Sequence, residues 1–350
     1  MKFRKKILTF LPLLVPLLLS NPIQAKPREL NIYGWADYLP REVLQKFEKE
    51  TGIICHYTTF SSNQELFTKL RINPKIGYDI IMPSTDIADQ MRREKMLLKL
   101  KKARLANLSN IIPGLRNRSY DPDNNYTIPF FWGTVGIMVN SEHFHPKDLE
   151  NWKDIWQAKY RNRLVLYDDM RDIFAVALRH CGYSINDQDP EHIKEAYQAL
   201  KQLQPNILAF LSDSIFKVFI NNDALIGIDE SGDWTKIHQE NPSVRFLEPK
   251  SRAILWIDTL AIPRFAPHPK EAHLFLNFLM RPKIAALCAL QVGFTTGNLS
   301  ALKLLHKNKE NSQILTPSLE LLQTGETEDF LPTNIRQLYI ALWGKLKTSF

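Results

Sequence analysis

Short apolar runs rich in β-branched residues alternate with amphipathic stretches in the first part of the chain. Such runs are typical of strands, and apolar residues at helical spacing indicate helices. Pro40 opens the first helical stretch and Gly52 supplies its C-terminal cap. The expected strands cover residues 30–33, 53–58 and 79–82, and the expected helices cover residues 40–52 and 65–72. The pattern predicts two consecutive βαβ units, with α/β layers around mostly parallel strands.

A second α/β series lies between two long β-rich passages. The passages cover residues 126–140 and 254–262, and the elements between them are strands at 164–167, 207–210 and 225–228 and helices at 173–181 and 190–203. No internal repeat, low-complexity tract or long Gly/Ser linker divides the sequence. We therefore expect two lobes that are joined by the two long strands.

The length of the chain also favours two lobes, because 350 residues exceed what one hydrophobic core usually supports. The N-terminal lobe is predicted to combine residues 26–134 and 257–302. The C-terminal lobe is predicted to combine residues 135–256 and 303–350. The first 25 residues belong to neither lobe.

These first 25 residues have the three-part pattern of a secretory signal peptide. The basic start consists of Lys2, Arg4, Lys5 and Lys6. The apolar run 7–19 is about 13 residues long, whereas a membrane-spanning helix needs roughly 20. Ile23-Gln24-Ala25 then offers a small-residue cleavage site. We expect export and a soluble mature chain that starts near Lys26; the alternative is an uncleaved N-terminal anchor.

The charge balance gives no case for a nucleic-acid partner. The chain has 45 Lys plus Arg and 37 Asp plus Glu, and its formal charge of +8 falls to +4 without residues 1–25. This mild surplus is spread along the chain. The densest basic stretch, residues 92–104, also carries leucines, and we interpret it as a helix end and loop with a solvated face.

Cysteine and histidine give little indication of a metal site. Cys55, Cys181 and Cys288 are an odd number without metal-type spacing, which excludes a disulfide scaffold and leaves one bridge or three buried thiols open. His143 and His145 are the only close histidine pair, and Pro146 places them in a loop. No metal site and no cofactor are therefore predicted.

Candidate chemistry lies just beyond the expected strands, because ligands of open α/β sheets bind outside the carboxyl ends of the strands. The residues there are aromatic, hydroxyl-bearing or acidic, and not one is Lys or Arg. They are Trp35, Asp37, Tyr38, Ser84, Thr85, Asp86, Asp168, Asp169, Asp172, Ser212, Asp213, Glu230, Trp256 and Asp258. Aromatic faces attract ammonium groups and cover methylenes, and carboxylates balance a cation that leaves water. The set disfavours anions and fits a linear polyamine.

Each of these signals also has a purely structural interpretation. The acids within residues 168–172 precede a helix, where one would act as its N-cap and another would stabilise the helix dipole. Trp256 and Asp258 alternate with apolar residues and so form one face of a strand. Trp35 and Tyr38 could belong to a turn that packs against its own lobe.

Six segments, in order along the sequence, resemble those of the periplasmic spermidine/putrescine-binding proteins of bacterial polyamine ABC importers. The segments are NIYGWADYLP (31–40), YDIIMPST (78–85), YTIPFFWG (126–133), LYDDMRDIFAVALR (166–179), WIDTLAIP (256–263) and LNFLMRP (276–282). The resemblance implies a two-lobed α/β periplasmic binding fold of type II, with a ligand cleft between the lobes and two crossover strands. It further implies a monomer in the periplasm that delivers its ligand to an inner-membrane ABC permease and catalyses no reaction.

The resemblance also implies which residues line the cleft. Trp35, Tyr38 and Trp256 would cover the aliphatic chain of the ligand, while the acids at 169, 172 and 258 would take its ammonium groups. The full predicted set is Trp35, Asp37, Tyr38, Ser84, Asp86, Asp169, Asp172, Ser212, Glu230, Trp256, Asp258, Phe294 and Glu328.

This sequence departs from the pattern of the family at several of these positions. The family usually has Glu at Asp172, Tyr near Asp86 and Phe294, Trp near Glu230, and Gln near Glu328. The cleft would then be more acidic and less aromatic than is usual. We hypothesise that it prefers a polyamine with more charges, spermidine over putrescine.

Other functional classes fit the sequence less well. Paired carboxylates can act as acid and base in a hydrolase, but no nucleophile elbow or Ser/His/Asp arrangement accompanies them. An exported adhesin or sensor would need an interaction surface that the sequence does not indicate. The closest alternative is a binding protein for another small organic cation, such as agmatine, thiamine or an opine, because a fold alone does not determine its ligand.

Overall fold

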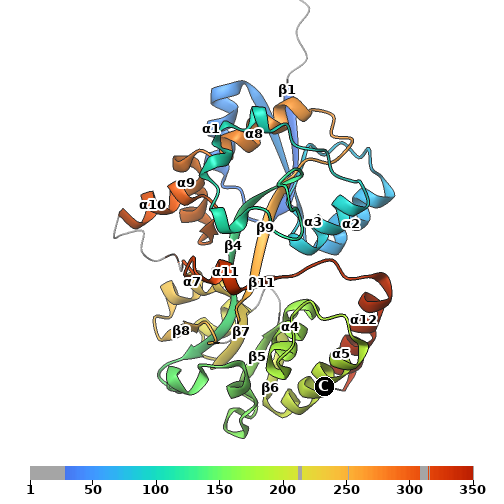
Figure 1. The fold of residues 1–350 in the computed structure, drawn as a ribbon. Coiled ribbons are helices and arrows are strands. Elements are labelled where there is room, and N and C mark those ends of the chain that lie inside the picture. The colour runs from blue at the N-terminus through green and yellow to red at the C-terminus, as the bar shows by residue number, and fades with distance from the viewer. Residues whose placement is uncertain (1–27, 212–214, 251, 308–313, 315, 350) are drawn as a thin grey trace, which may run out of the picture.

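The computed structural model describes residues 28–211, 215–250, 252–307, 314 and 316–349. The predicted signal peptide and the candidate residue Ser212 lie outside these residues. Figure 1 shows an elongated molecule of two lobes, one above the other, with β4 (Thr127–Asn140) and β9 (Ile254–Ala261) running between them. Within the described chain no single helix is long and apolar enough to cross a membrane; only a helix pair bent by 78° passes, on length and composition alone.

The upper lobe begins with the two predicted βαβ units. They consist of β1 (Arg28–Trp35), α1 (Arg41–Thr51), β2 (Ile53–Phe60), α2 (Asn63–Ile72) and β3 (Ile80–Ile81). Strand β1 pairs in parallel with both β2 and β3, so both units are confirmed. Gly52 ends α1 with φ of 68°, and Ser62 caps α2 by accepting a hydrogen bond from the backbone N–H of Glu65.

Later segments complete this lobe around the same sheet. They are α3 (Thr85–Arg93), α8 (Pro269–Leu279), α9 (Pro282–Val292), β10 (Thr295–Thr296) and α10 (Leu299–Lys307), with short 3-10 helices at Lys102–Arg104, Ala106–Asn110 and Pro113–Leu115. Phe47 of α1 packs edge-to-face on Phe275 and Phe278 of α8, with ring centroids 4.8 and 5.3 Å apart. This buried aromatic cluster fixes α8 against α1.

The lower lobe holds the second α/β series. Its elements are β5 (Leu164–Tyr167), α4 (Met170–Cys181), α5 (Pro190–Leu203), β6 (Ile207–Leu211), α6 (Ile215–Ile220), β7 (Ile226–Glu230), α7 (Ser231–Glu240), β8 (Val244–Leu247) and α12 (Thr333–Thr348), with 3-10 helices at Pro146–Leu149, Trp152–Trp156, Ala158–Tyr160 and Gln204–Asn206. Strand β5 pairs in parallel with β6 and β7. The five elements predicted here are present.

Strands β4 and β9 connect the two lobes through one continuous sheet. They pair antiparallel from Thr127 opposite Ala261 to Val135 opposite Ile254. The sheet order is β2-β1-β3-β9-β4-β7-β5-β6, and both crossing strands are buried along their whole length. The expectation of mostly parallel strands holds inside each lobe but is wrong at the crossings, because β4 and β9 run antiparallel to their main-path neighbours β3 and β7.

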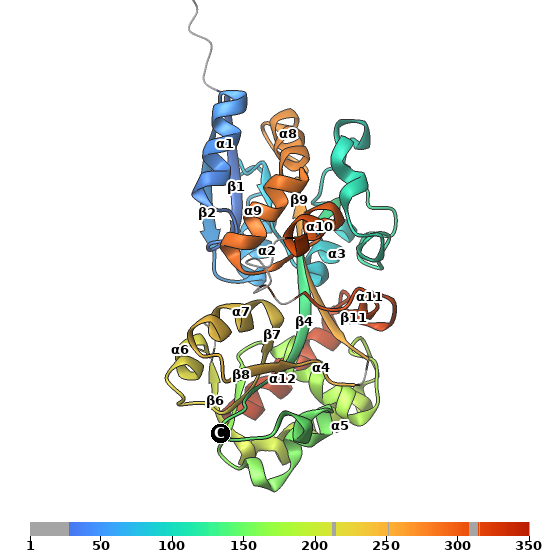
Figure 2. The same cartoon turned by 90° about the vertical axis from the view of Figure 1, so that its left-hand side faces the viewer.

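A third segment returns from the upper to the lower lobe, a crossing implied by the predicted assignment of residues 303–350 to the C-terminal lobe, although its elements were not predicted. After α10 in the upper lobe, the chain forms α11 (Leu321–Thr324) and β11 (Glu326–Thr327) between the lobes and ends with α12 below, as Figure 2 shows. Glu326 and Thr327 pair in parallel with Ile254 and Leu255 of β9. Residues 325–329, which we name the return segment, therefore lie beside the crossing strands and carry Glu328. The third expected lobe boundary, 302/303, falls inside α10, and the boundaries stay a prediction.

Candidate ligand-binding site between the lobes

Asp258 of β9 is the centre of a polar cluster formed with the upper lobe. Its carboxylate accepts hydrogen bonds from the hydroxyl of Tyr38, at 2.6 Å, and from the hydroxyl of Ser84. Ser84 is held in turn by Asn63, whose side chain donates to the Ser84 hydroxyl and accepts from its backbone N–H. Asp258 is 6% exposed, and burial raises its pKa to about 6 although the two hydroxyls oppose the shift. The result is a positioned carboxylate that is largely ionised at neutral pH.

Aromatic side chains surround this carboxylate. Tyr38 meets Phe131 and Phe294 edge-to-face, with ring centroids 5.4 and 5.5 Å apart, and Phe294 meets Trp256 at 5.6 Å. Trp35 lies beside Tyr38 at 6.2 Å. Among the described residues, neither indole N–H of these two tryptophans has a hydrogen-bond partner, although both nitrogens are buried. These rings therefore form an apolar wall that carries two indole N–H donors without an acceptor among the described residues.

Phe294 reaches this wall because of two glycines. Gly293 ends α9 in the left-handed region, with φ of 89°, and so turns the chain at the helix end. Gly232 at the start of α7 lies under the Phe294 ring, where a Cβ atom would come within 2.6 Å of the ring. The two lobes are thus in contact where the Phe294 ring of the upper lobe packs on the backbone of Gly232 in the lower lobe.

The lower lobe contributes two half-buried acids at the ends of its elements. Asp172 lies in the first turn of α4, and Glu230 is the last residue of β7. Burial and the charges of Asp169 and Asp229 raise the pKa of Asp172 well above its ordinary value. Burial and the charges of Asp172 and Asp258 do the same for the pKa of Glu230. The acid on the crossing strand β9 and the acids of the lower lobe are therefore close enough to repel one another.

Asp169 is the N-cap of α4, as its structural interpretation anticipated. One of its carboxylate oxygens accepts from the backbone N–H groups of Arg171 and Asp172, at 2.7 and 3.1 Å. This fixes the start of α4 and the direction of Asp172. Asp168 is paired outside the cluster, with both oxygens 2.7 Å from Nζ of Lys347 on α12.

Three residues near Glu230 were missed by the sequence analysis. Asp229 is only 1% exposed, and one oxygen accepts from the backbone N–H of Glu230 while the other has no partner among the described residues. Burial and the charge of Asp233 raise its pKa well above the ordinary value. Burial and the charge of Glu230 likewise raise the pKa of Tyr167. The sequence signal that could have revealed Asp229 was its place directly before Glu230. The strand predicted to end at residue 228 continues to Glu230.

Arg171 was also missed. It is the cation with the largest effect on both Glu328 and Asp86, and Arg336 has a smaller effect on Asp86. The Arg171 Nε is 3.7 Å from a carboxylate oxygen of Glu328, and its Nη1 donates to the backbone carbonyl of Asp329 at 3.3 Å. Burial lowers the pKa of Arg171, but the charges of Glu328 and Asp86 outweigh burial and raise it. Burial in turn raises the pKa of Asp86, and Arg171 opposes that shift.

Comparison with known proteins identifies the family of the chain. The family described as bacterial extracellular solute-binding protein matches residues 42–314. The chain belongs to this family. The "Spermidine/putrescine-binding periplasmic protein" of Escherichia coli strain K12 is 38% identical to this solute-binding protein over 300 residues, which cover 86% of each chain. The "Spermidine/putrescine-binding periplasmic protein 1" of Haemophilus influenzae is 33% identical over 319 residues, 91% of this chain and 88% of that protein.

Solved structures give the same result. A "Putative spermidine/putrescine ABC transporter" from Listeria monocytogenes superposes with a TM-score of 0.84 at 33% identity, covering 92% of this chain and 100% of that one. The spermidine/putrescine ABC transporter substrate-binding protein from Streptococcus pneumoniae gives 0.83 at 33% identity, covering 92% and 99%. The predicted family resemblance and the two-lobed type II periplasmic binding fold are confirmed.

The structure of this solute-binding protein brings most of the predicted site residues together. The residues linked by the contacts and charges described above are Trp35, Tyr38, Ser84, Asp86, Asp169, Asp172, Glu230, Trp256, Asp258, Phe294 and Glu328. Asp37 lies on the exposed turn after β1, with a left-handed φ of 61°, and its charge adds to burial in raising the pKa of Tyr57. That these residues bind a ligand stays a prediction.

The cysteines and the histidine pair lie outside this cluster. Cys55, Cys181 and Cys288 are all free, so the structure has three thiols and no bridge, but the expectation that all three are buried is wrong, because only Cys288 is. Within the described ranges, no group of three or more His, Cys, Asp or Glu side chains is arranged to hold a metal ion.

Proposed function

We propose that this protein is the substrate-binding component of a polyamine ABC importer and that it binds spermidine or putrescine between its lobes. The observation that carries the proposal is the set of buried and half-buried carboxyls contributed by both lobes and by β9, beside aromatic rings. Asp172 and Glu230 come from the lower lobe, and Asp258 is held by upper-lobe hydroxyls. Buried carboxylates that raise one another's pKa are stabilised when a cation lies among them.

The aromatic wall suits the rest of such a ligand. A polyamine consists of ammonium groups separated by methylenes, and rings such as Trp35, Tyr38 and Trp256 attract the first and cover the second. The hydroxyls of Tyr38 and Ser84 hold Asp258 in place, which spares the ligand the free energy of ordering that carboxylate. The names of the E. coli and H. influenzae relatives support the same ligand class.

The remaining parts of the proposal concern the location and partners of the protein. We propose that residues 1–25 act as a cleaved signal peptide, that the mature protein is a periplasmic monomer, and that it passes its ligand to an inner-membrane permease. Membership in a solute-binding family, whose relatives carry binding rather than enzyme names, supports transport without catalysis. These points are independent of which polyamine is preferred.

The experiment is a ligand-induced shift of the melting temperature, measured on the chain from Lys26 onward. The probes are putrescine, cadaverine, spermidine, spermine, agmatine and thiamine, with succinate as an anionic control. A ligand at about 100 times its Kd stabilises the folded state by about 2.7 kcal/mol, which is several degrees in Tm. We expect a shift with a polyamine and none with succinate. No shift with any of the linear amines would reject the proposal, and a shift with thiamine alone would replace it.

A further inference from the structure

Two of the acids that make this site unusually rich in carboxyls face a guanidinium of the protein. The negative charges of Glu328 and Asp86 both raise the pKa of Arg171. Burial raises the pKa of each acid, and Arg171 is the group that lowers it most. The Arg171 side chain is 11% exposed and the Glu328 side chain 18%, so solvent screens the interaction only in part. The sequence-based hypothesis counted both acids as charges available to the ligand, whereas the structure provides them with an internal cation.

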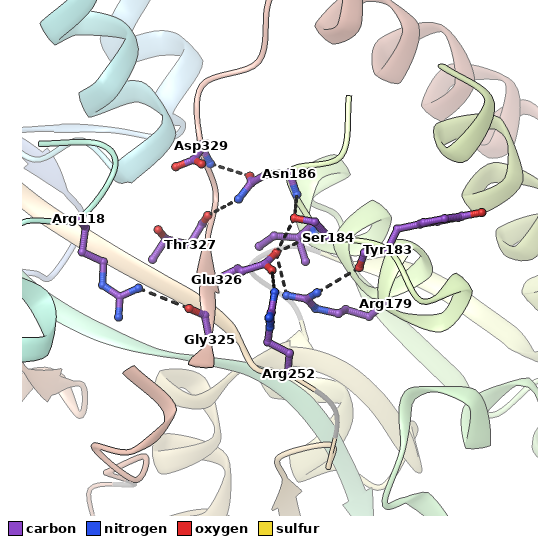
Figure 3. Close-up of polar contacts among 11 residues, drawn as sticks. Arg118, Arg179, Tyr183, Ser184, Asn186, Arg252, Gly325, Glu326, Thr327 and Asp329 are labelled. Atoms are coloured by element: carbon purple, nitrogen blue, oxygen red, sulfur yellow. Dashed lines mark hydrogen bonds and ion pairs between the residues drawn. The ribbon is translucent and has the colours of Figure 1, made fainter. Parts of the chain in front are cut away.

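Glu328 is held beside Arg171 because hydrogen bonds and ion pairs fix the return segment on either side of Glu328. Figure 3 shows the Glu326 carboxylate among Arg179, Arg252 and Ser184, with Arg179 at 2.9 Å and the Ser184 hydroxyl donating at 2.7 Å. The Asn186 side chain donates to the carbonyl of Thr327 at 2.9 Å and accepts from the N–H of Asp329 at 2.8 Å. Glu328 lies between these two fixed residues, so its position is set by the backbone.

The remaining acids receive less compensation from Arg171. For Asp172, the opposing effect of Arg171 is smaller than the effects of Asp169 and Asp229, and its pKa stays well above the ordinary value. The largest influences on Glu230 are burial and other acids, among them Asp258. Negative charge that no cation offsets is therefore concentrated in two places, at Asp258 and at the group formed by Asp172, Asp229 and Glu230.

We propose that Arg171 is a specificity-determining residue: its guanidinium occupies the Asp86–Glu328 side of the site as a built-in cation, so that the site selects organic cations with two positive charges over those with three. The proposal rests on the proposed function. One ammonium group of a dication lies at Asp258 and the other at Asp172 and Glu230. A third positive group must lie near Arg171, where like charges repel. The expected order, putrescine over spermidine, is the reverse of the order inferred from the sequence.

The experiment compares the Kd of putrescine and spermidine by titration calorimetry, for the wild type and for Arg171→Gln. Removing the guanidinium frees Glu328 for a third ammonium group and leaves Asp86 with only the weaker effect of Arg336. We expect the ratio of the two Kd values to move toward spermidine by at least about tenfold. The conservative variant Arg171→Lys keeps the charge and should keep the wild-type ratio.

Glu328→Gln is the opposite change, because it removes a negative charge instead of a positive one. The backbone around Glu328 is already fixed by its neighbours. It leaves Arg171 with less compensation, so the ratio should move further toward putrescine. In the double variant Arg171→Gln/Glu328→Gln, the ratio should lie between those of the two single variants. Because Glu328→Gln makes its own prediction, the proposal remains testable if Arg171→Gln does not fold.

The outcomes separate this proposal from the proposed function. If the wild type binds neither amine, the polyamine function fails. If the wild type binds both amines but Arg171→Gln changes the two Kd values by the same factor, the polyamine function stands and the role of Arg171 is rejected. A ratio that moves toward putrescine in Arg171→Gln also rejects it. Competition of calcium chloride with putrescine in the wild type would identify a metal site instead and overturn the proposal.

Discussion

At the scale of single residues, Asp258 shows how the fold keeps a buried carboxyl ready for a cation. Desolvation raises its pKa to about 6, and the hydroxyls of Tyr38 and Ser84 limit the rise. Asn63 acts one step further out, because its amide fixes both the hydroxyl and the backbone of Ser84. A carboxylate oriented in this way binds a cation without further rearrangement.

Substitution of Asp258 by Asn should therefore weaken polyamine binding. The amide keeps the shape of the side chain but leaves an ammonium group without its charge partner, so we expect at least about a tenfold higher Kd, or about 1.4 kcal/mol. Titration calorimetry with putrescine measures this. Asp168→Asn is the matched control, because Asp168 pairs with Lys347 on α12. An unchanged Kd for Asp258→Asn would remove that residue from the site.

The affinity should also depend on pH through the same group. Below its pKa of about 6 the Asp258 carboxyl is neutral, so cation binding weakens as the pH falls from 7.5 to 5.5. Asp172, Glu230 and Glu328 have their pKa values raised as well and add to the fall. Calorimetry at three pH values tests the slope, which should be smaller in Asp258→Asn. An affinity that rises on acidification would contradict the assignment.

At the scale of elements, hydrophobic periodicity correctly predicted the strands and helices whose bounds depend on local sequence alone. The strand at residues 164–167 and the helix at 190–203 have the expected bounds, because their apolar positions are regular. Helix α4 begins three residues before the expected 173, since Asp169 caps it ahead of its first buried residue. That shift places Arg171 in the first turn and explains why its role was missed.

Elements that depend on distant partners were less predictable. Strand β11 has two residues, too few to produce a pattern, and it forms because β9 offers a free edge beside it. The antiparallel pairings of β4 and β9 follow from the path of the chain between lobes, which periodicity does not encode. Most candidate site residues could be found because they follow strands, whereas Asp229 and Tyr167 become relevant only through tertiary burial.

The packing of β4 against α7 and β9 gives a prediction about stability. A Cβ atom at Gly133 would lie 2.2 Å from the Ser231 hydroxyl and 2.6 Å from the Trp256 ring. Gly133→Ala should therefore destabilise the protein by about 1–3 kcal/mol through overpacking. In Gly344→Ala on α12, no atom of the described residues lies within 4 Å of the new atom, and higher helix propensity should stabilise the protein by about 0.5–1 kcal/mol.

Urea unfolding of both glycine variants measures these changes directly. The two substitutions add the same methyl group, so their opposite signs isolate the effect of the surroundings. If Gly133→Ala were as stable as the wild type, the close approach of Trp256 and Ser231 to β4 would be wrong.

At the scale of the whole molecule, the lobes are connected by three chain segments but meet through charged and aromatic side chains. Strands β4 and β9 and the return segment cross between them. Asp86 of the upper lobe raises the pKa of Asp172 in the lower lobe, and Glu230 raises that of Tyr38. Repulsion between these acids opposes closure, and Arg171 offsets it mainly at Asp86 and Glu328. Under the proposed function, a bound cation would supply the missing attraction and shift the lobes toward closure, because its contacts with both lobes require the closed form.

Ligand should therefore make the protein more compact. We expect the radius of gyration from small-angle X-ray scattering to fall when putrescine is added at about 100 times its Kd, with the mature chain at neutral pH. Glu230→Gln removes one repelling charge, so its ligand-free radius should already lie closer to the ligand-bound value of the wild type. Gly344→Ala, which changes no charge, should behave as the wild type does. Identical radii with and without putrescine, at a concentration where calorimetry shows saturation, would mean that the acids between the lobes do not control closure.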